Sequence, residues 1–466
     1  MNRKHLILSM ALAGACFQTG SLFAQHSDHQ QGSSAARIGD GPSRVGDGTT
    51  ASMVGDADTA PTPALPATYP VPSAPMNFAP AAYSMPPAYD DAPAVAGGCS
   101  TGSCVEMCCP APTVNTGWVD GGALLWWSSA RKAPPLVTRH PNAGGLPVLS
   151  DPLTQVLAGG PSNVGDQMLP GFYAGGGMWL DDCQCIGVGG RVFGLFGGSQ
   201  NQTFTFDGQQ SLGVPFFNTS LGVQDAYLVG YNAGNLGTNT GSITVASDLD
   251  LIGAEAIVRK GMIQSNCGRL DLVGGYLFTK LDDSLILQTN LVDGITNAIA
   301  NGTSISTLDQ FSGSNTFHGG QLGLLSEFNR GKWSLSSGTK FGLGNMNQRV
   351  SVSGIYTEVP PNNVGPTVTE PRGFFVQSSN RGVQSQNVFA FIPQVDLKLG
   401  YQVRCNLRLD VGYSLMYFSN VALGGRQIDS NIDIANMLAQ PAAPSSKFET
   451  SSLLLHGLNL GATYSF

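Results

Sequence analysis

Charged residues and long apolar runs are both scarce in this chain of 466 residues. Asp, Glu, Lys and Arg make up 12% of it, and beyond the N-terminus no apolar run reaches the roughly 18 residues of a membrane helix. The net charge is −8 and no block of Lys or Arg occurs, which argues against a nucleic-acid partner. The motifs G-x-S-x-G, H-E-x-x-H and Walker A are absent. We therefore expect no enzyme, cofactor or metal site.

Glycine, in contrast, is abundant at 61 residues, and the C-terminus alternates between apolar and polar positions. Leu458, Leu460, Ala462 and Tyr464 alternate with small or polar residues, and the chain ends on Phe466. Period two predicts a strand with one apolar and one polar face. Such a terminal aromatic strand is typical of outer-membrane β-barrels, in which the barrel-assembly machinery reads it, although a soluble β-sandwich could end in the same way. The expected assembly signal is Leu458, Leu460, Tyr464 and Phe466.

The same alternation recurs along the rest of the chain. Ten segments after Gly117 show it, and short and long connections join them in turn: 118–128, 171–180, 185–196, 248–259, 269–280, 316–328, 333–343, 387–400, 405–418 and 453–466. With the N-terminus in the periplasm, every short connection falls on the periplasmic side, as in transmembrane barrels. We predict an all-β fold, a single closed antiparallel transmembrane β-barrel of about ten strands. A further hairpin at 203–206 and 226–231 would make twelve.

The two faces of these segments differ in chemistry. Leu409 and Val411 share one face of their segment, while Arg408 and Asp410 share the other. A charge facing lipid near the midplane would cost about 2–4 kcal/mol, so we expect the apolar face to contact lipid. The polar face would then line a lumen in which opposite charges pair, because an unpaired buried charge is costly. The predicted lumen-facing residues are Arg191, Glu255, Arg269, Asp271, Glu327, Lys340, Asp396, Lys398, Arg408 and Asp410.

Aromatic residues gather near the ends of the predicted segments. Phe328 and Trp333 would lie near the periplasmic interface, and Trp126 and Phe418 near the outer one. Two girdles of this kind suit amphipathic rings at the two headgroup layers. The alternation and the girdles together favour a membrane barrel over a soluble fold.

The N-terminal part indicates export. Basic residues, a short apolar run and a cleavage site within 1–24 have the layout of a signal peptide. Residues 25–116 are rich in Gly, Pro and Ala with few large apolar side chains, so we expect a disordered periplasmic segment ahead of the barrel at 117–466. This segment is either a plain linker or a tether to the cell wall or to an envelope protein. In an alternative interpretation of the leader, Cys16 is lipidated.

Eight of the nine cysteines follow the predicted signal peptide, and the ten-strand topology places all eight on the periplasmic side. They are Cys99, Cys104, Cys108, Cys109, Cys183, Cys185, Cys267 and Cys405. An even number in an exported protein points to disulfides, so we hypothesise that the cluster at 99–109 is joined to the periplasmic turns, with the individual pairs left open. The alternative is a metal site at 99–109, but the cluster lacks His and its spacing is not that of a zinc site.

Several short motifs occur in the same order in a known family. They are Leu-Leu-Trp-Trp at 124–127, Gly-Met-Trp-Leu-Asp at 177–181, Gly-Val-Gly-Gly-Arg at 187–191, Gly-Gly-Tyr at 274–276 and His-Gly-Leu-Asn-Leu-Gly at 456–461. In these motifs the chain resembles a planctomycete family of outer-membrane barrels, beta-barrel porin family seven, over about 117–466. The resemblance implies a porin-like barrel in the outer membrane and names no solute, catalytic residue or binding residue.

The predicted function is therefore that of a porin-like outer-membrane barrel that allows limited passage of small solutes. Ten strands enclose a small bore that side chains can fill. The alternative is accordingly a non-conducting structural or adhesive barrel that acts through its long extracellular loops. Outer-membrane lipid and the barrel-assembly machinery are the expected partners.

Overall fold

The computed structural model describes residues 116–466 apart from 162–163, 166–167, 266, 296–299, 364 and 439–440. The predicted signal peptide (1–24) and the segment up to residue 115 lie outside the described residues, and with them four of the eight cysteines that follow the signal peptide. These cysteines are Cys99, Cys104, Cys108 and Cys109. Within the described part, no helix combines the length and apolar character needed to cross a membrane.

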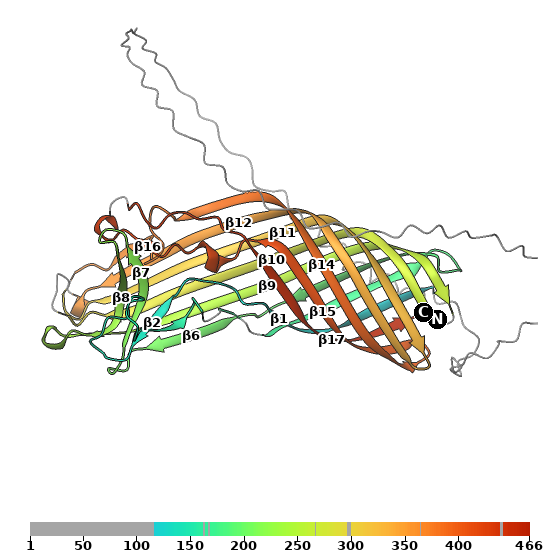
Figure 1. The fold of residues 1–466 in the computed structure, drawn as a ribbon, viewed down its shortest axis with the longest axis horizontal. Coiled ribbons are helices and arrows are strands. Elements are labelled where there is room, and N and C mark those ends of the chain that lie inside the picture. Colours follow the sequence, from blue (N-terminus) through green and yellow to red (C-terminus); the bar gives the residue numbers. More distant parts are fainter. Residues whose placement is uncertain are drawn as a thin grey trace, which may run out of the picture. The chain divides into compact units, whose positions relative to one another are not determined.

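Ten strands of the described part form a closed antiparallel barrel (Figure 1). In ring order they are β1 (Gly117–Ser128), β4 (Met168–Trp179), β5 (Ile186–Leu195), β9 (Thr238–Ser265), β10 (Gly268–Val292), β11 (Ser304–Arg330), β12 (Trp333–Val359), β14 (Gly382–Arg404), β15 (Leu407–Val421) and β17 (Ser451–Ser465). Pairing of β17 with β1 closes the ring. The predicted barrel of about ten strands is confirmed, and each predicted segment overlaps one of these strands.

The apolar faces of the strands point outward, as the alternation predicted. On β15, Leu409 and Val411 are 51% and 46% exposed. On β17, Leu458, Leu460 and Tyr464 are also exposed. A ring of apolar side chains on the outside of a closed barrel is the surface that lipid requires.

The aromatic girdle at the short-turn end is present, whereas part of the predicted outer girdle is not. Phe328 and Trp333 are exposed beside the short turns. Trp126 and Phe418, however, are buried inside the barrel, so their predicted place in the outer girdle is wrong. Successive residues of a strand point to opposite faces, and each of these two follows or precedes a residue that faces outward, so its own ring faces inward.

Four neighbouring strands, β9 to β12, are much longer than predicted, with 28, 25, 27 and 27 residues. Such a strand runs about 90 Å, whereas a lipid-facing band is about 25 Å tall. Beyond this band the pattern inverts: on β10 Lys280 and Asp282 face outward, while Leu281 and Leu285 are buried inside. Parts of the predicted long loops at 197–247, 281–315 and 344–386 are therefore strands. We call the parts of β9 to β12 that lie beyond the lipid-facing band the outer extension.

Short strands pack against the outer extension and do not enter the ring. They are β2 (Val137–His140), β3 (Gln155–Ala158), β7 (Ser211–Asn218), β8 (Val223–Asn232) and β16 (Asn431–Ile432), with β6 (Gln200–Thr205) paired to β9 and β13 (Val368–Glu370) paired to β12. Four 3-10 turns complete the described part of the chain: η1 (Gly234–Leu236), η2 (Pro361–Asn363), η3 (Gly424–Gln427) and η4 (Ile434–Asn436). The segments 203–206 and 226–231 thus contribute strands outside the ring, and the count stays at ten.

Candidate functional site

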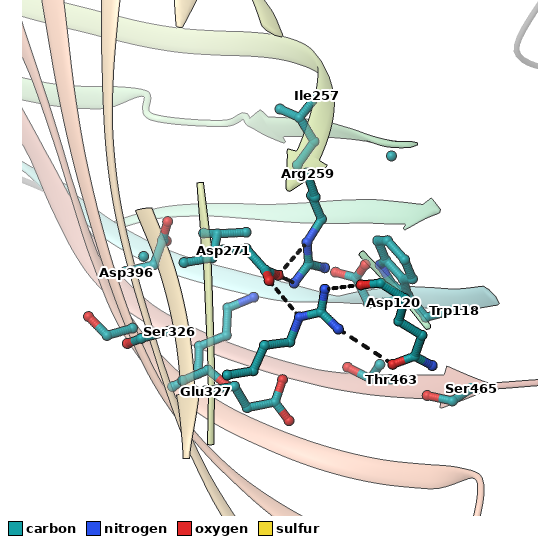
Figure 2. Close-up of a pocket in the computed structure, with 18 of the residues that line it drawn as sticks. Trp118, Asp120, Ile257, Arg259, Asp271, Ser326, Glu327, Asp396, Thr463 and Ser465 are labelled. Carbon is teal, nitrogen blue, oxygen red and sulfur yellow. Dashed lines mark hydrogen bonds and ion pairs between the residues drawn. The ribbon is translucent and has the colours of Figure 1, made fainter. Parts of the chain in front are cut away.

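The inner wall of the barrel is charged in the half nearest the short turns. There the strands surround a cavity of about 520 Å³, whose wall reaches Gly117, Gly268 and Ser465 beside the turns. In transmembrane barrels of the outer membrane the short turns face the periplasm. We therefore call the cavity the periplasmic vestibule. Figure 2 shows Arg259 and Asp271 pointing toward each other within it.

Ion pairs organise the vestibule, some within one strand, some between neighbouring strands and some between strands that are not adjacent in the ring. Their N–O distances are 3.9 Å for Arg191–Glu255, 2.5 Å for Lys340–Glu255, 2.6 Å for Arg259–Asp271, 2.6 Å for Arg269–Asp271, 2.9 Å for Arg408–Glu327 and 2.9 Å for Arg408–Asp410. Asp396 accepts a hydrogen bond from the hydroxyl of Ser414, and the Lys398 ammonium lies 5.2 Å from the ring centre of Tyr173. Nine of the ten residues predicted to face the lumen line this cavity, and the tenth, Asp410, is paired with Arg408 beside it. Pairing matters because a buried charge that loses its partner is strongly destabilising.

Two charged residues of the vestibule were absent from the prediction. Asp120 on β1 and Arg259 on β9 both line the cavity. Arg259 could have been predicted from the sequence, because it follows Glu255 by four residues and an even spacing places both on the same face of the strand. Asp120 likewise shares its strand face with Trp118, which also lines the cavity.

Farther from the short turns, the same inward positions become apolar, and one buried cluster crosses the lumen. It includes Leu124 and Trp126 of β1, Leu169 and Tyr173 of β4, Phe193 and Leu195 of β5, Leu249 and Leu251 of β9, Leu277 and Leu281 of β10, Phe317 of β11, Met346 of β12, Ala390 and Ile392 of β14, Met416 and Phe418 of β15, and Leu453 and Leu455 of β17. All ten ring strands contribute. We call this cluster the apolar layer. Ion pairs therefore line the periplasmic half of the lumen, and the apolar layer fills the level next to it.

A second buried apolar cluster fills the outer extension. It joins residues such as Phe311 to the short strands and to the segment 374–376. Asp309 on β11, in the outer extension and so outside the lipid-facing band, accepts hydrogen bonds from the backbone N–H groups of Phe374 (3.0 Å) and Val376 (2.8 Å). Burial raises the pKa of Asp309 to about 7, although these N–H groups oppose the shift.

The four described cysteines fall into two kinds. Cys267 and Cys405 are each disulfide-bonded, whereas Cys183 and Cys185, in the turn between β4 and β5, are exposed free thiols. The Cys183 Sγ lies 2.9 Å from a carboxylate oxygen of Asp181. This hydrogen bond lowers the pKa of Asp181 and raises the pKa of the Cys183 thiol to about 11.

A closed antiparallel barrel with an apolar outer belt and a charged vestibule defines an outer-membrane β-barrel. The family described as Putative beta barrel porin-7 (BBP7) matches residues 118–466, and the chain belongs to this family. It is a porin-like protein of the outer membrane, as the sequence motifs predicted. Comparison with curated proteins gives no match.

Several solved structures are similar to this chain at low identity. The outer membrane protease OmpT from Escherichia coli is 10% identical, with 78% of this chain and 100% of that chain covered and a TM-score of 0.35. A Pseudomonas aeruginosa FadL homologue is 8% identical, covering 76% and 91%, with a TM-score of 0.21. The P. putida toluene transporter TodX is 8% identical, covering 76% and 90%, with a TM-score of 0.18.

Proposed function

We propose that this porin-like protein allows only limited passage of small solutes, because the apolar layer closes its lumen. The observation that carries the proposal is that one buried cluster draws side chains from all ten ring strands. A permanent water path through this level would wet some of the inward side chains, yet Leu277, Phe317 and Phe418 are fully buried. Apolar constrictions exclude water and ions and act as gates in membrane pores.

The vestibule sets the chemistry of a solute that approaches from the periplasm. Its wall carries Arg and Lys beside Asp and Glu, already paired across strands, so a small polar solute meets charges of both signs. Farther passage requires side chains of the apolar layer to move apart. Passage is therefore slow and limited to small molecules.

A second function, as a non-conducting structural or adhesive barrel, is supported by the outer extension. Strands β9 to β12 continue well past the lipid-facing band, and they enclose an apolar cluster of their own. A folded outer extension of this size is not required to close a pore. In this function the extension presents a rigid surface outside the cell, and the apolar layer seals the membrane.

Single-channel recording in planar bilayers tests the first proposal. Wild-type protein should give rare, small conductance steps, and Phe317→Ala should give more frequent or larger ones because it opens a gap in the apolar layer. The matched control is Phe389→Ala, which removes a ring that is 67% exposed on the outside of β14. A folded wild type that stays silent, together with a silent Phe317→Ala, would favour the structural function. Large sustained wild-type steps that Phe317→Ala leaves unchanged would refute closure by the apolar layer.

The N-terminal features and the partners belong to the same proposal. We infer that residues 1–24 are removed on export, that 25–116 form a periplasmic segment, and that the chain is not an enzyme. Outer-membrane lipid and the barrel-assembly machinery are its proposed partners, with the cell wall or an envelope protein for the N-terminal segment. The intact mass of the mature protein tests both cleavage after residue 24 and the alternative of acylation at Cys16.

A further inference from the structure

The turn between β4 and β5 brings two thiols and a carboxylate together at the periplasmic end of the barrel. The Sγ atoms of Cys183 and Cys185 are 2.7 Å apart, and Cys183 Sγ is 2.9 Å from Asp181 Oδ2. One potential ligand atom from each of the three residues lies within 4.8 Å of the others. Both thiols are exposed, so a small ion can reach them from solution.

The shape of the turn is fixed by its own hydrogen bonds. The Asp181 carboxylate accepts the backbone N–H groups of Cys185 (3.1 Å) and Ile186 (3.0 Å). Gln184, between the two cysteines, has a φ of 53°, a left-handed conformation that non-glycine residues seldom adopt. This backbone turn places the two sulfur atoms on the same side as the carboxylate. The ligands are therefore held together before any ion arrives.

Arg269, a residue of the vestibule wall, holds the backbone at Gln184 in place. The guanidinium of Arg269 donates a 2.6 Å hydrogen bond to the backbone oxygen of Gln184. Arg269 is itself paired with Asp271 and lies 3.9 Å from the ring centre of Trp179. The turn is thus tied to the charged wall at the mouth of the vestibule.

We propose that Asp181, Cys183 and Cys185 bind a thiophilic divalent cation of the Zn²⁺ class. Thiolate sulfur and carboxylate oxygen are ligands that Zn²⁺ accepts, and water would complete four-coordination. On binding, Zn²⁺ replaces the two thiol protons, which leave to solvent. With Zn–S bonds of about 2.3 Å in a tetrahedral site, the sulfurs move to about 3.8 Å apart. Exposed side chains can make that adjustment by rotation.

Charge favours a cation here over disulfide exchange. A carboxylate beside a thiol disfavours the thiolate that attacks disulfides, whereas the same carboxylate attracts a metal ion. A metal ion in turn deprotonates the thiols that bind it. The site does not depend on whether the barrel conducts.

Titration of the reduced, full-length mature protein in detergent with Cd²⁺ tests the proposal, because cadmium thiolates absorb in the ultraviolet. Wild type should bind one Cd²⁺ per chain more than the Cys183→Ser/Cys185→Ser double variant, and Zn²⁺ should displace it. Asp181→Asn should weaken this binding by about tenfold or more, as removal of even an outer-shell partner does. The control is Asp182→Asn, which alters the neighbouring carboxylate outside the cluster and should leave binding unchanged.

Three results would overturn the site. The first is equal Cd²⁺ binding by wild type and the double Cys variant, which would place the ion on other cysteines. The second is an equal loss of affinity in Asp181→Asn and Asp182→Asn, which would reduce the effect to general charge. The third is peptide mapping of protein purified without reductant that finds Cys183 and Cys185 joined to each other, combined with no Cd²⁺ binding after reduction.

Discussion

The guanidinium of Arg131 is buried against the carboxylate of Asp283. We call this ion pair the clasp, because its hydrogen bonds join β9 and β10 of the outer extension to two loop segments. Arg131, in the loop after β1, also donates to the hydroxyl of Ser247 (2.6 Å) and to the backbone oxygen of Asp248 (3.0 Å) on β9. Asp283 on β10 accepts the N–H of Gly424 (2.6 Å) at the start of η3. The clasp thus holds two loop segments against the outer extension.

Asp283→Asn should destabilise the barrel by about 3–5 kcal/mol, because it leaves the buried guanidinium of Arg131 without a counter-charge. The change keeps the shape of the side chain, so the loss reports on charge. Urea unfolding in detergent micelles, followed by tryptophan fluorescence, measures it. The matched control is the next carboxylate, Asp282→Asn. Its partner Lys280 is 2.8 Å away, but both side chains are over 40% exposed, so little stability should be lost.

The two neighbouring carboxylates make the result decisive. If Asp282→Asn and Asp283→Asn lower the unfolding midpoint equally, the clasp contributes no more to stability than the exposed ion pair. If the clasp also holds the loops over the lumen, Asp283→Asn should raise the frequency of conductance steps in a protein that is still folded. Asp282→Asn should leave the steps unchanged.

Glu255→Gln should strongly destabilise the wall of the vestibule. Glu255 on β9 is buried between Lys340 and Arg191, with its side chain 4% exposed. Removing its charge leaves two buried cations without their shared partner, at a cost of about 3–5 kcal/mol. The double variant Glu255→Gln/Lys340→Met should recover part of this loss, because it removes one of the uncompensated charges. A double variant that is no more stable than Glu255→Gln in urea unfolding would show that the pair does not act through charge.

Much of the fold could be predicted because a membrane barrel imposes one rule on every strand. Alternate residues face lipid. Once Leu409 and Val411 were assigned to the lipid face of their segment, the residues between them were assigned to the inner face. The same parity placed Arg191, Glu255 and Lys340 on the inner wall, where they meet. The partners of each charge could not be predicted, because they depend on the register between strands far apart in the sequence.

The outer extension could not be predicted, because its alternation has the opposite sense. Outside the membrane, water wets the outer face and side chains fill the inside, so Leu281 and Leu285 point inward where Leu270 and Leu272 point outward. Where the apolar residues move from the outer face to the inner face within one strand, the sequence pattern looks as if the strand had ended. Arg131 gave no signal either, because its partner Asp283 lies 152 residues away, in a predicted loop.

The two disulfide-bonded cysteines of the periplasmic turns, Cys267 and Cys405, should be found joined to the cluster at 99–109. Cys267 and Cys405 are both disulfide-bonded, and their turns are separated by several strands of the ring. We propose that both reach cysteines of this cluster, whose residues lie outside the described part of the chain. Peptide mapping without reductant should recover the peptides that contain Cys267 and Cys405 linked to peptides from 99–109. Free thiols at both positions would contradict the hypothesis, and a Cys267–Cys405 link would replace it.

Asp309 should make the stability of the outer extension depend on pH. Burial raises its pKa from 3.8 to about 7 in the folded protein, so its contribution to stability is fully present below about pH 4 and is lost as the pH rises through 7. Asp309→Asn stays neutral at every pH, so wild type should lose stability relative to this variant between pH 5 and pH 8. Urea midpoints of both proteins, with Asp282→Asn as an exposed control that keeps the wild-type slope, measure the difference. Parallel curves for wild type and Asp309→Asn would mean that the carboxyl is ionised across this range, held by the N–H groups of Phe374 and Val376.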